Sequence, residues 1–323
     1  MGRCRRLSAR TAWRMAKHRR IVVLGAGLIG AAMVRAARRI SSDSEIVLLS
    51  RSLPEHLSSM LSPGEAAIGE IGKGGLRGLL KDGDVVFACH GLAAPRTPLN
   101  EARQLVVPVL EASTELLEEV ASLSGTDLIV FSSGGSVYGE TTEPVTEMQP
   151  VAPESVYGVT KVAEELLLQQ LHGDRDNRVT RLRVATLYSA PGFQARTQGL
   201  VQLVIRLLGD GREVPVYGRG RSLRDYVHVD DLADLALMIA QREGSAEGYE
   251  VFNVGTGTVH SILDVIGLVA ESMGVDSPKL RFTEGPEFDV VLDVGRLRET
   301  HPDWSPRPLA RGLAEILSAR TET

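Results

Sequence analysis

The sequence contains very little cysteine and no apolar run long enough to cross a bilayer. Cys4 and Cys89 are the only cysteines in 323 residues, too few for a disulfide framework and not at a metal-ligand spacing. Cys89 ends the apolar segment DVVFAC, which predicts a buried thiol without a chemical role. We therefore expect a cytoplasmic protein with no metal site and no membrane partner.

Acidic residues are missing from the first twenty positions, which contain eight Lys and Arg residues. Such a start can be an organelle transit peptide or a nucleic-acid-binding arm, but we favour a disordered basic extension over residues 1–18. Without these twenty residues the chain has 28 basic and 41 acidic side chains, a net charge of −13. A protein with this much negative charge is a poor general binder of nucleic acid. If it binds phosphate groups, it must do so at focused sites.

Internal repeats and low-complexity tracts are also absent, and the chain instead alternates buried strands with amphipathic helices. The expected strands are 20–24, 45–49, 66–71, 84–89, 127–131 and 179–184, and the expected helices between them are 28–39, 99–123 and 155–171. This order predicts an α/β fold, a doubly wound parallel sheet with helices on both faces. Pro108 should bend or break the second of these helices.

The alternation weakens after residue 186, which predicts a smaller second lobe. We expect a dinucleotide-binding domain over 19–186, to which 227–256 returns, and a substrate-binding lobe from 187–226 and 257–323.

A glycine-rich turn follows the first strand. Gly25, Gly27 and Gly30 fit the pattern G-x-G-x-x-G between that strand and a helix, with Leu28 and Ile29 inside the turn. Glycines at this spacing allow a tight turn and let backbone N–H groups and the helix N-terminus approach a pyrophosphate. The turn therefore predicts a dinucleotide site, although a turn that merely packs helix on strand is the alternative.

The second strand ends in Ser50 and Arg51, where NAD-preferring folds usually have an acidic residue for the ribose hydroxyls. Arg51 can instead meet the 2′-phosphate of NADP, or it can be a solvated surface residue. The sequence leaves both cofactors open.

Tyr157 and Lys161 stand four residues apart in YGVTK and therefore share one face of a helix. An ammonium beside a phenol stabilises the phenolate, which can then exchange a proton with a substrate hydroxyl. Surface Tyr–Lys pairs are common, but this one follows the glycine turn and a Ser-Ser-Gly-Gly strand end at suitable distances. We therefore predict that Tyr157 and Lys161 are catalytic and also contact the cofactor.

Five segments together resemble the extended short-chain dehydrogenase/reductase family, in its nucleotide-sugar epimerase/dehydratase branch. They are VVLGAGLIG, FSSGGSVYG (131–139), YGVTK, RDYVHVDDLA (224–233) and FNVGTG (252–257), and the resemblance spans residues 20–317. It implies a Rossmann-type fold, bound NAD and a homodimer formed through the helices over 99–123 and 155–171. It also implies that Arg224 reaches the diphosphate of a nucleotide-sugar, whereas an ion pair with Asp225 or Asp230 is the structural alternative. Glu70 approaches the adenine under this resemblance, or else it is a solvated residue.

Several positions depart from the family pattern. The catalytic Ser or Thr expected before VYG is Gly134, so Ser133 or Ser136 would have to replace it. Gly135 and Ser136 stand where the dehydratases have Asp-Glu, which disfavours sugar dehydration. Thr186 replaces a substrate-binding Asn, Leu105 replaces another Asn, and the arginine before F-D-V is Pro286 or Glu287.

Three functions follow from these observations. The first is an NAD-dependent nucleotide-sugar epimerase, acting at C4 of a UDP-hexose, in which Tyr157 is the acid/base. The second is an NADP-dependent carbonyl reductase of the same family, which Arg51 favours and Arg224 disfavours. The third is a dinucleotide-binding sensor or scaffold without catalysis, which Gly134, Leu105 and Thr186 favour.

Overall fold

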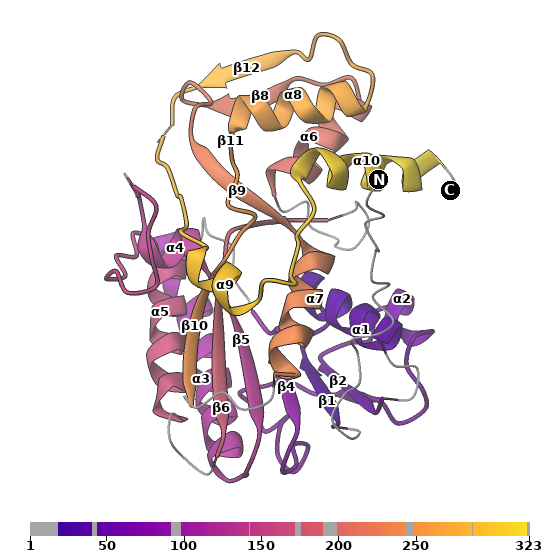
Figure 1. The fold of residues 1–323 in the computed structure, drawn as a ribbon, viewed down its shortest axis with the longest axis vertical. Coiled ribbons are helices and arrows are strands. Elements are labelled where there is room, and N and C mark those ends of the chain that lie inside the picture. The colour runs from indigo at the N-terminus through magenta and orange to yellow at the C-terminus, as the bar shows by residue number, and fades with distance from the viewer. Residues whose placement is uncertain are drawn as a thin grey trace, which may run out of the picture.

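The computed structural model describes residues 19–40, 44–91, 98–141, 143–171, 176–189, 199–242, 248–285 and 287–321. The extension expected over residues 1–18 lies outside this range. A seven-stranded parallel sheet forms the centre of the molecule, in the order β10-β6-β5-β4-β1-β2-β3 (Figure 1). Its strands are β1 (Ile21–Leu24), β2 (Ile46–Ser50), β3 (Ala66–Ile68), β4 (Val85–Ala88), β5 (Asp127–Ser133), β6 (Arg178–Val184) and β10 (Tyr249–Val254).

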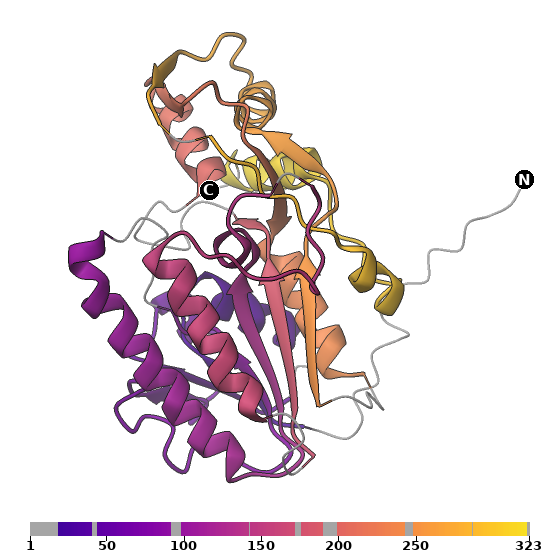
Figure 2. The same ribbon diagram turned by 90° about the vertical axis from the view of Figure 1, so that its left-hand side faces the viewer.

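Helices cover both faces of this sheet. Helices α1 (Leu28–Ile40) and α7 (Val229–Ala240) pack together on one face, and α3 (Ala102–Ala121) and α5 (Val156–Leu168) pack together on the other (Figure 2). The predicted doubly wound α/β fold is therefore confirmed, and it is of the Rossmann type. Helix α3 continues through Pro108, so the proline does not break it.

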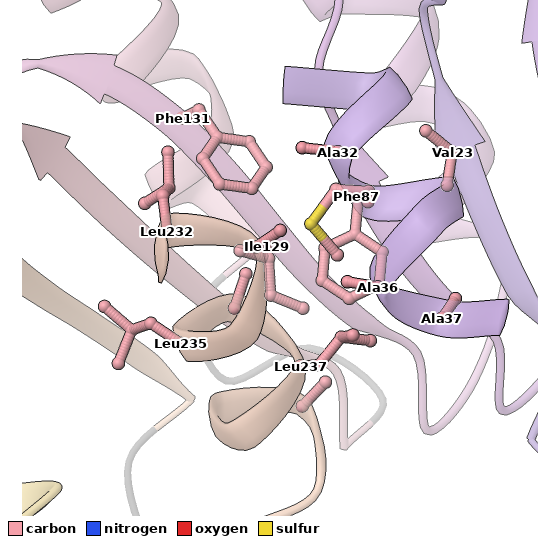
Figure 3. Packing of buried hydrophobic residues seen from close by; sticks show 14 of the residues in the cluster. Val23, Ala32, Ala36, Ala37, Phe87, Ile129, Phe131, Leu232, Leu235 and Leu237 are labelled. Carbon is pink, nitrogen blue, oxygen red and sulfur yellow. The ribbon is translucent and has the colours of Figure 1, made fainter. Parts of the chain in front are cut away.

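Alternate residues of the central strands fill two separate cores, as expected for a sheet covered on both sides. Val23, Phe87 and Ile129 face α1 and α7 and pack against residues such as Leu232 (Figure 3). The next residues along the same strands belong to the core under α3 and α5, which also contains Leu116. This two-sided burial explains why the strands appear in the sequence as continuous apolar runs.

Helix α7 returns to the sheet from late in the sequence, and charged side chains tie it to α1. Arg35 Nη2 lies 2.7 Å from Asp230 Oδ1, and Arg39 pairs with Asp234 one turn further along both helices. These pairs supplement the apolar contact between the two helices and fix their register.

The second lobe lies beyond the carboxyl ends of the central strands and has its own apolar core (Figure 1). It contains a three-stranded sheet in the order β11-β9-β7 and a two-stranded sheet of β8 and β12. Its elements are β7 (Thr186–Tyr188), α6 (Leu200–Gly209), β8 (Val214–Tyr217), β9 (Leu223–His228), β11 (Val259–Ser261), α8 (Ile262–Ser272), β12 (Leu280–Thr283) and α10 (Leu309–Thr321). Short helical segments complete the described chain: α2 (Glu55–Ser58), η1 (Leu99–Glu101), α4 (Gly134–Tyr138), η2 (Gln169–Leu171) and α9 (Gly295–Thr300).

Candidate active site

The carboxyl ends of three neighbouring strands, β1, β4 and β5, lie side by side. The chain passes from β1 to β2 on one side and later places β4 on the other side, so the direction of winding reverses between β1 and β4. Ligands of open α/β sheets bind in the crevice at such a switch point. Gly25 and His90 follow β1 and β4, and Ser133 ends β5, so all three lie at this edge.

Glycine is required for a different reason at each of the three glycine positions in the first turn. Gly25 has a φ of +104°, a conformation that favours glycine. A Cβ on Gly30 would lie 1.8 Å from the Gly25 carbonyl oxygen, so the entry of α1 can pack closely only with glycine there. A Cβ on Gly27 would meet nothing within 4 Å. The space beside Gly27, in front of the N-terminus of α1, therefore fits a diphosphate group.

Two substitutions in this turn should separate folding from cofactor binding. Gly30→Ala should lower the free energy of unfolding by about 2 kcal/mol or more, because the added Cβ meets backbone. Gly27→Ala should leave stability nearly unchanged and weaken dinucleotide binding at least about tenfold, because its methyl group occupies the open cradle. Urea denaturation and calorimetric titration with NAD measure the two effects. Unchanged NAD affinity in folded Gly27→Ala would place the diphosphate elsewhere.

Tyr157 and Lys161 lie on the first two turns of α5, which Ser155 caps by accepting the Gly158 N–H at 3.0 Å. Tyr157 is half-buried, whereas Lys161 is buried. Burial by itself lowers the pKa of Lys161, but Glu164 and then Tyr157 outweigh it, and the pKa is raised. The ammonium therefore stays charged, and the Tyr157 phenol is close enough to act on it electrostatically.

The Ser133 hydroxyl donates to the Ser136 hydroxyl at 3.1 Å, so the two candidate hydroxyls are neighbours beside the site. Gly134 lies between them, and a Cβ there would be 2.7 Å from Leu292 Cδ1. Gly134 thus permits the close approach of the segment that carries Leu292. The space taken by a Ser or Thr side chain in the family pattern is filled by an apolar group here.

The other predicted cofactor residues lie at the edge of the dinucleotide half. Arg51 follows β2 and is exposed, and Leu28 and Ile29 are partly buried against the core. Glu70 forms an exposed pair with Lys73, with Nζ and Oε2 3.0 Å apart. That pair agrees with a solvated glutamate and leaves the carboxylate reachable.

The predicted substrate residues Arg224 and Thr186 lie on adjacent strands β9 and β7, whose register places Thr186 opposite Tyr226. The Arg224 guanidinium stacks 4.5 Å from the Phe288 ring centroid and donates to the carbonyls of Leu223 and Phe288. Burial lowers the pKa of Arg224, and no ion pair links it to a carboxylate among the described residues.

The acidic neighbours of Arg224 are occupied elsewhere. Asp225 accepts the Thr256 hydroxyl and the Gly257 N–H, and Asp230 pairs with Arg35. The ion pair considered as an alternative for Arg224 is therefore not formed. His228 Nδ1 accepts the Asp230 N–H and caps α7, which is a structural role.

Pro286 and Glu287 are the two candidates for the position of the missing family arginine. Glu287 Oε1 accepts the N–H groups of Arg219 and Arg221 at 2.6 and 3.2 Å, and Pro286 lies outside the described residues. Glu287 thus orders the loop between β8 and β9.

Sequence reasoning missed the charged groups behind the Tyr–Lys pair. Glu164 binds Lys161, and Glu165 binds Arg181 and Arg183, all of them buried. His90 faces Glu164 from the end of β4. A signal was present, because residues three and four positions after Lys161 lie on the same face of α5 as Lys161.

Within the described part of the chain, no group of three or more His, Cys, Asp or Glu residues is suited to hold a metal ion. No described helix is both long and apolar enough to span a membrane. Cys89 is a free, half-buried thiol whose pKa is raised by burial, consistent with an unreactive thiol.

The fold, the glycine turn and the Tyr–Lys pair together define a Rossmann-type protein with the features of a dinucleotide-dependent enzyme. Residues 21–255 match the model of the NAD dependent epimerase/dehydratase family. The chain belongs to this family, as the sequence resemblance predicted, and it is an enzyme.

Relatives with known names agree with this assignment. A UDP-glucose 4-epimerase of Mycolicibacterium smegmatis is 31% identical over 315 residues, which cover 93% of this chain and 97% of the relative. The solved structure of MoeE5 in complex with UDP-glucose and NAD is 28% identical, with a TM-score of 0.77 over 94% of this chain and 99% of that one. A UDP-glucuronic acid 4-epimerase from Bacillus cereus, at 23% identity, shares the fold with a TM-score of 0.82 over 94% of this chain and 100% of that one.

Proposed function

We propose that the protein is an NAD-dependent nucleotide-sugar epimerase that acts at C4 of a UDP-hexose. The observation that carries this proposal is the buried, charged Lys161 one helical turn after Tyr157 on α5, in a chain whose first strand runs into a glycine-rich turn. The names of the similar proteins, a UDP-glucose 4-epimerase and a protein solved with UDP-glucose and NAD, support the substrate class and the cofactor.

Each predicted residue has a task in this reaction. Tyr157, as the phenolate, takes the proton of the reacting hydroxyl and later returns it, and Lys161 stabilises the phenolate that exists before the first step and after the second. A bound NAD would supply the hydride acceptor and donor for the sugar carbon, and the glycine turn with Tyr157 and Lys161 would hold it. Ser133 or Ser136, whose hydroxyls lie 3.1 Å apart, donates to the reacting oxygen in place of a side chain at Gly134.

Substrate binding falls to the second lobe in this proposal. Residues 187–226 and 257–323 form the substrate-binding lobe, and residues 227–256 return to the dinucleotide-binding domain over 19–186. Arg224, which forms no ion pair among the described residues, offers a positive charge to the diphosphate. Thr186 on the neighbouring strand contacts the sugar.

Arg51 supports a second candidate, an NADP-dependent carbonyl reductase. It is exposed at the end of β2, where a 2′-phosphate would lie, and no acid stands beside it to select a free ribose hydroxyl. In this case Tyr157 and Lys161 keep their tasks, and the reaction consumes NADPH.

We further propose a homodimer formed through α3 and α5. These helices pack together and expose apolar side chains on their outer surface, namely Val107, Val159 and Leu166. Val159 and Leu166 are seven residues apart and so lie on one stripe of α5. A cytoplasmic location stays a prediction from the cysteine content.

Mass spectrometry of the small molecules released on denaturation, combined with an assay on UDP-glucose, tests the proposed function. We expect bound NAD and conversion of UDP-glucose to its C4 epimer without net change in NADH absorbance. Steady oxidation of NADPH with a ketone substrate, and no isomerisation, would instead establish the reductase.

A further inference from the structure

A buried carboxylate lies directly behind the Lys161 ammonium. Glu164 Oε2 is 2.8 Å from Lys161 Nζ, and their side chains are 2% and 7% exposed. The two residues are three positions apart on α5 and share its buried face. A charge-assisted hydrogen bond in such a site holds the lysine side chain in one orientation.

His90 closes the other side of this carboxylate. Its Nε2 lies 3.6 Å from Glu164 Oε1, beyond hydrogen-bond distance, and neither ring nitrogen has a hydrogen-bond partner among the described residues. The backbone of His90 also adjoins the glycine turn, because a Cβ on Gly25 would lie 3.1 Å from His90 N. One connected group thus extends from the dinucleotide turn, through His90 and Glu164, to Lys161.

Burial and the attraction between neighbouring charges determine the protonation states of Glu164, Lys161 and His90. Burial raises the pKa of Glu164, but Lys161, His90 and Arg181 outweigh it and the pKa is lowered. Burial and Lys161 lower the pKa of His90 against the opposing effect of Glu164. At neutral pH Glu164 is therefore an anion, Lys161 a cation and His90 uncharged. Arg181 and Tyr157 are the other titratable groups that act on the pair.

We propose that Glu164 is a positioning residue that sets how strongly the Lys161 charge acts on Tyr157. In this proposal His90 keeps water away from Glu164 Oε1, the carboxylate oxygen that does not bind Lys161. The carboxylate orients the ammonium and also partly neutralises it. Lys161 therefore stabilises the Tyr157 phenolate less than an unpaired ammonium would. The Tyr157 phenol can then give its proton back as readily as the phenolate takes it. A reversible proton exchange requires this balance. This inference rests on the proposed role of Tyr157 as acid/base.

Glu164→Gln tests the proposal, because it keeps the shape and an oxygen for Lys161 but removes the negative charge. We expect the phenolate absorbance of Tyr157 to appear at a pH about one unit lower than in the unchanged protein. The Tyr157 signal is the difference between each protein and the same protein carrying Tyr157→Phe. The acid limb of the kcat/KM profile should move to lower pH in parallel. Glu118→Gln, on the exposed surface of α3, is the matched control and should move neither.

The phenolate titration needs no substrate, so it separates this inference from the proposed function. A shifted titration without epimerase activity would contradict the proposed function and leave the role of Glu164 intact. An unshifted titration in folded Glu164→Gln, or a uniform loss of kcat at every pH, would overturn the inference.

A second comparison covers the case in which Glu164→Gln does not fold. Lys161→Met/Glu164→Gln leaves no unpaired charge in this group and can be compared with Lys161→Met alone. Because Glu164 acts on Tyr157 through Lys161, the double variant and the single variant should form the Tyr157 phenolate at the same pH. A phenolate that forms at lower pH in the double variant would show that Glu164 acts on Tyr157 directly, and would overturn the inference.

Discussion

Tyr157→Phe is expected to lower kcat about a thousandfold and to change the affinity for NAD by less than about threefold. Phenylalanine keeps the ring at the start of α5 but cannot exchange a proton with the substrate hydroxyl. Lys161 remains paired with Glu164, so the glycine turn and the charge behind the site are unchanged. Single-turnover kinetics with UDP-glucose and calorimetric titration with NAD measure the two quantities.

Tyr249→Phe is the matched control for this substitution. Tyr249 is the first residue of β10, which is an edge strand of the central sheet. Its hydroxyl accepts a hydrogen bond from Arg181 at 3.0 Å. Its loss should cost about 1 kcal/mol of stability and leave kcat unchanged. A Tyr157→Phe protein with more than about a tenth of the original kcat would show that another group exchanges the proton.

The largest expected effect on stability comes from Glu165→Ala. Glu165 Oε2 lies 2.7 Å from Arg183 Nη2 and 3.2 Å from Arg181 Nη1, and the Arg181 side chain is fully buried. Removing the carboxylate leaves two buried cations without an ion-pair partner among the described residues, since Arg183 otherwise donates to the neutral Tyr138 hydroxyl. We expect the free energy of unfolding to fall by about 3–5 kcal/mol.

Urea denaturation of Glu165→Ala and of Glu118→Ala measures this effect. Glu118 is exposed on α3, and its replacement should change stability by less than about 0.5 kcal/mol. If Glu165→Ala cost no more than the Glu118 variant, the arginines would have to find other partners or solvent. Glu164 pairs with Lys161 on its own helix, whereas Glu165 pairs with two arginines of β6. Such a result would mean that the ion pairs of Glu165 contribute little to stability.

The sheet and its helices could be predicted from the sequence because their signals are local. Short apolar runs rich in β-branched residues identified β1, β2, β4 and β5, and periodic apolar residues identified α1 and α5. The second lobe was predicted less completely. Strands β9 and β11 were not expected, since their residues face a lobe boundary and show no simple alternation of apolar and polar residues.

Some features of the candidate site could be predicted from the sequence, and others could not. The glycine turn and the Tyr–Lys spacing need only neighbours within one turn or one helix, so the sequence suffices for them. The task of Gly134 could not be predicted, because Leu292, which occupies the adjacent space, is far away in the chain. The same holds for Arg224, whose stacking partner Phe288 comes from the segment after β12.

The sequence by itself determined the class of fold, the dinucleotide turn and the phenol–ammonium pair, because each depends on residues that are close along the chain. The tertiary structure alone decided that His90 meets Glu164 behind Lys161 and that Glu165 neutralises two arginines of β6. Those contacts join different elements, and their formation depends on strand order and helix packing. Burial then gives these charges their effect, since a charge inside the protein acts on its neighbours far more strongly than one in water.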